Sequence, residues 1–255
     1  MTTPISPLFT SPYYNQLYET MRYLDYDEIL QLCNTNRQTR SFCQNSFLVN
    51  RLLISRKTDQ YINNYGTPLQ ALIAASAQGN LNIVNELLRR GVNPTDNYLV
   101  FLGAIDKRRL NVVKRLLDAG VDPSIQNNYA INRAASEGDL NLVSLLLNHP
   151  KVDPGAKSNQ AIINASMRGF THIVRQLLSH SKVDPSVRDN EAIRLANRNG
   201  HDDIVALLLK DPRVYSSLDP VFCSKLESKL IQDQLLDQYD DFDFEFDEDF
   251  DEDLD

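Results

Sequence analysis

Apolar residues recur through the middle of the chain with a period of 31 positions. Three consecutive segments align without gaps, and they begin at Asn128, Asn159 and Asn190. Their apolar residues follow spacings of three and four, which is the pattern of amphipathic helices. The aligned positions are Ile131/Ile162/Ile193, Ala134/Ala165/Ala196, Gly138/Gly169/Gly200, Val143/Val174/Val205 and Leu146/Leu177/Leu208. The pattern predicts two helices in each segment. One such pair cannot bury its apolar face alone, so the segments are expected to stack.

Residues that end helices stand at regular places in the same segments. Gly138 and its equivalents follow the first helix, where glycine adopts a positive φ at little cost. An Asp-Pro step follows the second helix, and it predicts a turn because proline cannot continue a helix. These steps begin at Asp122, Asp153 and Asp184. The asparagine that opens each segment is expected to be the N-cap of the first helix.

Two earlier segments, 67–94 and 95–123, extend the array, and in the second of them Arg108 stands where the other units have glycine. The five units resemble ankyrin repeats through Thr67-Pro68-Leu69, the Ile-Val-x-x-Leu-Leu second helices and the turns Gly91-Val92-Asn93-Pro94 and Gly120-Val121-Asp122-Pro123. The resemblance implies an all-α, ankyrin-type helical solenoid over 67–215, with later units at 124–154, 155–185 and 186–215. Units of about 30 residues are shorter than the usual ankyrin repeat. They are similar to the divergent arrays of giant DNA viruses and protists.

The N-terminal part has no such period. After a flexible start at 1–12, residues 13–57 are predicted to form three short helices, the second beginning at Asp25. The stretch 24–53 resembles the F-box motif, although the usual Leu-Pro opening is missing and the chain has no Trp. That resemblance implies a Skp1-type subunit of a cullin ubiquitin ligase as partner. The residues it assigns to this partner are Leu24, Ile29, Leu32, Cys33, Phe42 and Phe47. The alternative is a helical cap that covers the apolar flank of the first repeat. The polar stretch 58–66 is the expected linker.

The C-terminal part combines a helix with an acidic tail. Residues 216–238 are predicted to hold a capping helix with Pro220 in its first turn. Residues 239–255 are too highly charged to fold alone and are expected to be disordered. Four aromatic residues alternate with the tail's acids: Phe242, Phe244, Phe246 and Phe250. The tail is therefore either a solubilising segment or an acidic-aromatic binding segment.

Charge is unevenly distributed along the chain. The net charge is −8, from 26 basic and 34 acidic residues, yet the last 16 residues hold 11 of the acids. The rest is mildly basic, which favours an acidic or phosphorylated partner. Seven basic residues fall within 27 positions: Arg89, Arg90, Lys107, Arg108, Arg109, Lys114 and Arg115. A solvated face is the simplest interpretation of this cluster, and phosphate binding is the alternative.

Sequence motifs of enzymes are missing. The chain has no GxSxG, phosphate-binding glycine loop, HExxH or CxxC motif. Its four histidines, His149, His172, His180 and His201, occupy unrelated repeat positions. Catalysis, a cofactor and a metal are therefore not expected. Cys33 and Cys43 are predicted to be buried thiols. With no signal peptide or membrane span expected, the predicted location is the cytoplasm (of the host if the source is viral), with the nucleus left open.

The sequence thus predicts a monomeric, non-catalytic protein–protein interaction scaffold that binds neither membranes nor nucleic acid. Its leading role is a substrate-recruiting adaptor of a ubiquitin ligase. The alternatives are a plain scaffold without a ligase link and an acidic-tail decoy for basic nucleic-acid-binding proteins. Partner contacts on the array are expected at exposed first-helix and turn positions. These are Tyr98, Tyr129, Arg133, Glu137, Lys157, Asn164, Arg168, Arg188, Arg194 and Arg198.

Overall fold

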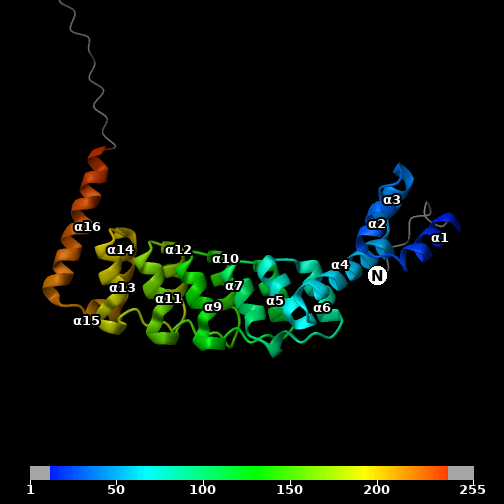
Figure 1. Ribbon diagram of the computed structural model, residues 1–255. Coiled ribbons are helices and arrows are strands. Elements are labelled where there is room, and N and C mark those ends of the chain that lie inside the picture. Colours follow the sequence, from blue (N-terminus) through cyan, green and yellow to red (C-terminus); the bar gives the residue numbers. More distant parts are fainter. Residues whose placement is uncertain (1–11, 241–255) are drawn as a thin grey trace, which may run out of the picture. The chain divides into compact units, whose positions relative to one another are not determined.

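The computed structural model describes the backbone of residues 12–240 and the side chains of residues 12–232 (Figure 1). Every regular element in this range is a helix, and the described residues contain no strand. The all-α class is therefore confirmed. The four phenylalanines of the predicted tail lie outside the described residues. The chain divides into two compact units, one of residues 1–134 and 141–152, the other of residues 135–140 and 153–255.

The N-terminal bundle, as we call α1 to α4, has one more helix than the sequence indicates. Its members are α1 (Pro12–Met21), α2 (Tyr26–Cys33), α3 (Arg37–Asn45) and α4 (Phe47–Tyr65). α2 begins as predicted. The Asp25 carboxylate accepts the Glu28 N–H at 2.8 Å, and the Glu28 carboxylate accepts the Asp25 N–H at 2.9 Å. Asn36 and Ser46 cap α3 and α4 in the same manner, each with one bond. The buried core consists of Met21, Ile29, Cys33, Phe42, Cys43 and Val49.

Cys33 and Cys43 form a disulfide between α2 and α3, so the expectation of two free thiols is wrong. Both residues are buried, as expected. The chain turns sharply between the two helices, and this turn brings the two Cα atoms to 5.8 Å from each other. That distance suits a disulfide, whereas ten positions of sequence separation gave no sign of it. Cys223 is a buried free cysteine.

The predicted linker at 58–66 is also wrong, because α4 continues as one helix to Tyr65 and Gly66 ends it with φ 85°. Thr58 is fully buried, and its hydroxyl donates to the Ile54 carbonyl at 2.7 Å, so this polar residue is satisfied inside the helix. α4 packs on both helices of the first repeat. It therefore belongs to the bundle at one end and covers the flank of the array at the other, as the capping interpretation requires.

In the first compact unit, repeat helices follow α4 in pairs. They are α5 (Pro68–Gln78), α6 (Leu81–Arg89), α7 (Leu99–Asp106), α8 (Leu110–Asp118), α9 (Ile125–Ser136) and α10 (Leu140–Leu147), with the short 3-10 helix η2 (Pro94–Asp96) before α7. The end of α9 and the first residue of α10, within 135–140, belong to the second unit. α5 packs on α7 and α6 packs on α8, so first helices stack on first helices and second on second. Ile83, Val84 and Leu87 of α6 bury the apolar face that its spacing predicts.

The second unit repeats this arrangement and ends with two further helices. Its repeat helices are α11 (Ala156–Met167), α12 (Thr171–Leu178), α13 (Val187–Arg198) and α14 (Asp202–Leu209). The expected C-terminal cap is split into α15 (Pro212–Ser217) and α16 (Pro220–Asp240), and both pack on α14. Cys223 and Leu226 are the buried residues of α16 among those with described side chains. Tyr239 and Asp240, which the sequence assigns to the tail, are helical, because α16 reaches Asp240.

The turns between repeats bear out the prediction for aspartate. The Asp122 carboxylate accepts the Ser124 N–H at 2.9 Å, Asp153 accepts the Gly155 N–H at 3.0 Å, and Asp184 accepts the Ser186 N–H at 3.0 Å. These bonds close the turn that each Asp-Pro step begins. Hydrogen bonds from Ser186 are also the main reason that the pKa of Asp184 is lowered.

The prediction for the three asparagines is wrong. Asn128, Asn159 and Asn190 have φ of 56°, 61° and 58°, in the left-handed region, whereas an N-cap has an extended backbone. Each is nearly buried and ends a left-handed turn of three residues. The Asn159 side-chain oxygen accepts the Asp184 N–H at 2.8 Å, and that of Asn190 accepts the Ser217 hydroxyl at 3.1 Å. In the second unit, Asn159 therefore joins its repeat to the turn that opens the next one, and Asn190 joins the last repeat to α15.

Candidate protein-binding surfaces

The predicted array residues lie on first helices or beside them. Tyr98, with 51% of its surface exposed, is the N-cap of α7. The other exposed members are Lys157, Arg168, Arg188 and Arg198. The half-buried members are Tyr129, Arg133, Glu137, Asn164 and Arg194. The array therefore offers these side chains to a partner to different degrees.

In the first unit, Asp106 gathers two of the predicted residues. The Tyr129 hydroxyl donates to Asp106 Oδ1 at 2.7 Å, and Arg133 Nε lies 3.3 Å from the same oxygen. Sequence reasoning missed Asp106 because a single acid beside a turn resembles turn chemistry. It also missed Leu99, which is exposed next to Tyr98 although its apolar character suggested a core position. The start of α7 thus presents the exposed apolar pair Tyr98 and Leu99, and the end of α7 presents Asp106 with its fixed polar partners.

In the second unit, Arg188 organises a polar network. Its guanidinium donates to Gln160 Oε1 at 3.0 Å, to the Lys157 carbonyl at 2.8 Å and to Glu191 Oε2 at 3.3 Å. Gln160 in turn donates to Asn164 at 2.8 Å. These side chains are held in place before any partner arrives, which lowers the entropy cost of binding.

Arg194 has an intramolecular role. Its Nε donates to the Asp189 carbonyl at 2.7 Å, and its guanidinium lies over the Phe222 ring, 5.0 Å from the centroid. The second contact is a cation–π interaction that fixes the start of α16. Arg168 and Arg198 remain exposed.

The six F-box-like residues divide by burial. Ile29, Cys33 and Phe42 are in the core of the bundle, where Phe42 stacks on Tyr14 with the ring centroids 4.7 Å apart. Leu24 and Leu32 are half-buried against this core. Phe47 is 74% exposed at the start of α4, and its neighbour Leu48 is also exposed. The buried three can act on a partner only by shaping the bundle, whereas Phe47 can touch one.

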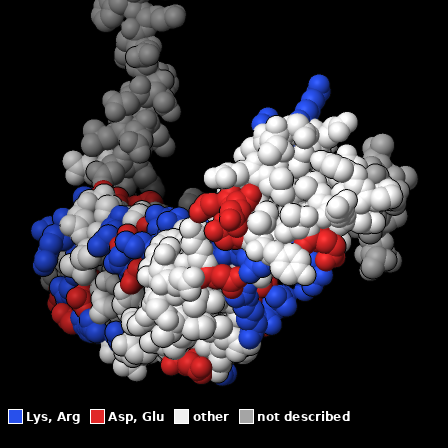
Figure 2. Space-filling view, turned by 45° about the vertical axis from the view of Figure 1, so that its right-hand side comes forward, with Lys and Arg blue, Asp and Glu red and all other residues white. Residues whose placement is uncertain are grey.

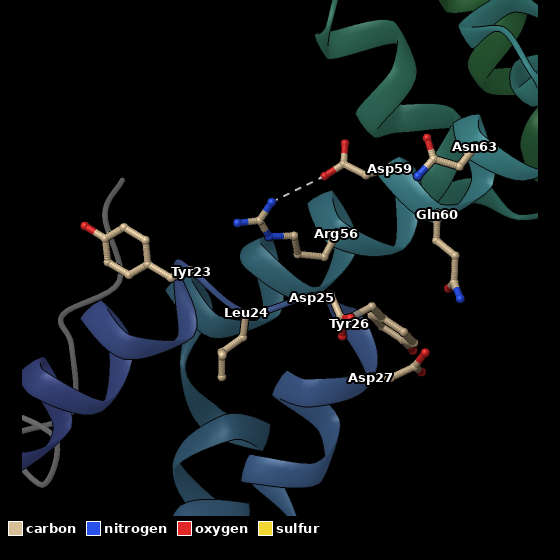
Figure 3. A pocket seen from close by; sticks show the side chains of 9 residues that line it. All are labelled: Tyr23, Leu24, Asp25, Tyr26, Asp27, Arg56, Asp59, Gln60 and Asn63. Carbon is tan, nitrogen blue, oxygen red and sulfur yellow. Dashed lines mark ion pairs between the residues drawn. The ribbon is translucent and has the colours of Figure 1, made fainter.

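A cleft of about 350 Å³ lies between the start of α2 and the middle of α4 (Figure 3). Tyr23 to Asp27 line one side, and Arg56, Asp59, Gln60 and Asn63 line the other. Arg56 and Asp59 form a long ion pair of 3.8 Å, drawn dashed in Figure 3. Asp25 is already used as a helix cap. The cleft is lined by aspartates, tyrosines, an arginine and amides, so it offers hydrogen bonds and charge to a ligand.

A charged network joins α4 to α6. Glu86 is only 6% exposed and accepts hydrogen bonds from Arg89 at 2.6 and 2.8 Å and from Arg90 at 2.9 Å. Arg90 also donates to Asp59 at 2.7 Å and to the Ser55 hydroxyl at 2.8 Å. The hydrogen bonds from Arg89, followed by those from Arg90, lower the pKa of Glu86 to about 2. These arginines are thus largely neutralised.

Figure 2 shows how charge is distributed over one face. On this face, Lys and Arg side chains gather in several groups on the repeats, with Asp and Glu side chains between them, and a large uncharged area also lies on it.

His201 has a structural position. Its ring lies against Gly169, where an added Cβ would come within 2.7 Å, and its Nε2 is 3.2 Å from the Met167 carbonyl. Among the residues that the structure describes, no group of His, Cys, Asp or Glu has the arrangement of a metal site. No described helix is both long enough and apolar enough to cross a membrane.

Comparison with family models identifies the repeats. Residues 103–147 match a model described as ankyrin repeats in many copies, and residues 131–217 match one described as ankyrin repeats in three copies. No curated protein matches the chain. The matched range contains most of the predicted array residues, from Tyr129 to Arg198. The helix pairs, their stacking and these matches agree, and the chain therefore carries ankyrin repeats in a helical solenoid that serves as a protein–protein interaction scaffold.

Proposed function

We propose that this scaffold is a non-catalytic adaptor, which holds a protein target on its repeats and docks a Skp1-type subunit of a cullin ubiquitin ligase through its N-terminal bundle. In this role the chain acts as a monomer in the cytoplasm, that of the host if the source is viral. The ankyrin repeats account for the target-binding half of the proposal. The docking half rests on the N-terminal bundle.

The observation that carries the docking half is the exposed pair Phe47 and Leu48. Both are large apolar side chains at the first turn of α4, directly after the buried Phe42–Cys43 part of the core. Large exposed apolar residues next to a rigid core are typical of protein interfaces. The stretch that resembles the F-box motif ends in this aromatic-leucine segment, so resemblance and exposure favour the same place.

The continuity of α4 supports an adaptor in particular. One helix of 19 residues belongs to the bundle and to the first layer of the array, and Arg90 ties its middle to α6. A partner of the bundle would thus be held at a fixed distance from a target bound to the first repeats. A ligase needs this arrangement to present its target.

The test is affinity capture of a purified Skp1-type subunit by the full-length chain. The paired substitutions Phe47→Ala and Leu48→Ala remove exposed side chains and are expected to leave helix content unchanged. Capture should fall at least tenfold, because exposed aromatic anchors carry much of an interface's energy. Tyr98→Ala with Leu99→Ala is the matched control, since it removes another exposed aromatic-leucine pair, from α7, and should capture normally.

If the unmodified chain captures no Skp1-type subunit, the ligase role fails and the plain scaffold remains. If capture needs residues 240–255 instead of Phe47 and Leu48, the acidic-tail decoy is the better account.

A further inference from the structure

One strongly basic surface on the array has no assigned use. Residues 107–115 contain five basic residues and no acidic one, and no nine-residue stretch elsewhere holds more than three. We call Lys107, Arg108, Arg109, Lys114 and Arg115 the α8 basic surface. All but the half-buried Arg115 are exposed, and they lie at the turn before α8 and on its outer side.

Two of its guanidinium groups are held by neutral partners. Arg109 Nε donates to the Ala77 carbonyl at 3.2 Å, and its side chain lies against Gly79. Arg115 Nε donates to Asn85 Oδ1 at 2.7 Å. Both side chains are therefore fixed in position while their charge remains available. Fixed cations lose less entropy when they bind an anion.

Carboxylates do not neutralise four of the five residues of this surface. Within the described part of the chain, no ion pair joins Lys107, Arg109, Lys114 or Arg115 to an acid. The acids that flank the stretch in sequence are Asp106 and Asp118. Asp106 serves Tyr129 and Arg133, and Asp118 forms no ion pair with another described residue. Like charges at this density repel one another, so an anionic partner would relieve the repulsion.

The shape and length of the α8 basic surface favour a short extended peptide segment as its ligand. Gly79, Arg108, Arg109, Leu110, Asn111 and Val112 line a depression of about 370 Å³ at the start of α8. The nine residues of α8 span about 13 Å, which is the length of about four residues of an extended peptide. A segment with carboxylates at alternate positions would present them on one side. Residues 107–115 contain no aromatic side chain on which a nucleic-acid base could stack.

We propose that the α8 basic surface binds an acidic peptide segment of a partner protein, which contacts Lys107, Arg109, Lys114 and Arg115 through carboxylates. This requires only that the array binds protein, and it does not depend on the proposed ligase link. It names the chemical class of one target, an acidic peptide, which the match to ankyrin-repeat models does not give.

The experiment measures fluorescence anisotropy of a labelled 16-residue peptide of alternating Glu and Ser, titrated with the full-length chain at low salt. Lys107→Gln with Lys114→Gln should weaken binding about fivefold or more, since each removes an exposed charge without a partner. Arg168→Gln with Lys182→Gln is the control. It changes the net charge equally on exposed residues of the second unit and should alter affinity less than twofold. Raising the salt should weaken binding of the unmodified chain.

Four results would overturn the proposal. They are no binding at about 100 μM protein, equal weakening in the control variant, tighter binding of a DNA duplex than of the peptide with the same dependence on Lys107 and Lys114, and binding that appears only after residues 240–255 are deleted. The last result would make the chain's own acidic segment the occupant. All four are independent of Skp1 capture, so either proposal can fail without the other.

Discussion

Arg108 occupies a backbone conformation that costs free energy. Its φ is 55°, and the equivalent glycines Gly79, Gly138, Gly169 and Gly200 have φ between 71° and 82°. The turn between the two helices of a repeat thus needs a positive φ whichever residue stands there. For a residue with a side chain, this left-handed conformation costs about 1 kcal/mol or more of free energy, whereas for glycine it does not.

Arg108→Gly should therefore raise the free energy of unfolding by about 0.5–1 kcal/mol, after the greater freedom of glycine in the unfolded chain is allowed for. Lys107→Gly is the control, because φ of Lys107 is −97° and glycine brings no relief there. Chemical denaturation of both variants and the unmodified chain measures the difference. Equal destabilisation by both would contradict the account of Arg108.

Asn159 should be sensitive to substitution for two separable reasons. Asn159→Gly loses the bond to the Asp184 N–H but tolerates the positive φ, and it should cost about 1 kcal/mol. Asn159→Ala also adds the left-handed strain and should cost about 2 kcal/mol. Ser158→Ala is the control, since it exchanges one side-chain type for another at a similar φ. Thermal unfolding checks the order, and the account fails if Ala is tolerated better than Gly.

At the scale of helices, the pattern of apolar residues predicts most of what is found. Spacings of three and four locate the buried faces of the repeat helices, and the Asp-Pro steps locate the turns. The helix at 58–65 could not be predicted in this way. Its polar residues resemble a linker until the contacts are known, because Thr58 satisfies its own hydroxyl and Asp59 meets Arg90 from another helix. Long-range pairing of this kind leaves no periodic trace in the sequence.

The network of Glu86 with Arg89 and Arg90 should make stability depend on pH. The pKa of Glu86 is lowered to about 2 from 4.5, so the folded state favours the ionised form. Its contribution is complete above pH 4.5 and is lost as pH falls from about 4.5 toward 2. With the partial exposure of Arg89 taken into account, the expected loss is about 2 kcal/mol.

Denaturation at several pH values between 7 and 2.5 measures this loss. Glu86→Gln should be less stable at pH 7 and should show a shallower decline with acid. Glu19→Gln is the matched control, because the ion pair of Glu19 is with the exposed Arg22, directly after the end of its own helix. An unchanged acid profile in Glu86→Gln would show that the buried network contributes nothing.

For the molecule as a whole, the sequence predicts the class of fold and the kind of function better than it predicts which surface residues contact a partner. Residues in the 31-residue period indicate an ankyrin array, and family models match it. The disulfide between Cys33 and Cys43, the left-handed asparagines and the role of Asp106 depend on how segments meet in space. For the same reason Ile29 and Phe42, which align with partner-binding motif positions, are core residues, and the exposed pair Phe47 and Leu48 carries the docking proposal.

Hydrogen exchange of the full-length chain, with and without a saturating Skp1-type subunit, shows where on the chain this subunit docks. We expect slower exchange in α1 to the first turns of α4, within residues 12–57, and unchanged exchange in α5 to α8. The paired Phe47→Ala and Leu48→Ala substitutions should abolish this protection. Protection confined to the repeats, or none at any residue, would contradict the claim that the N-terminal bundle is the docking part of an ankyrin adaptor.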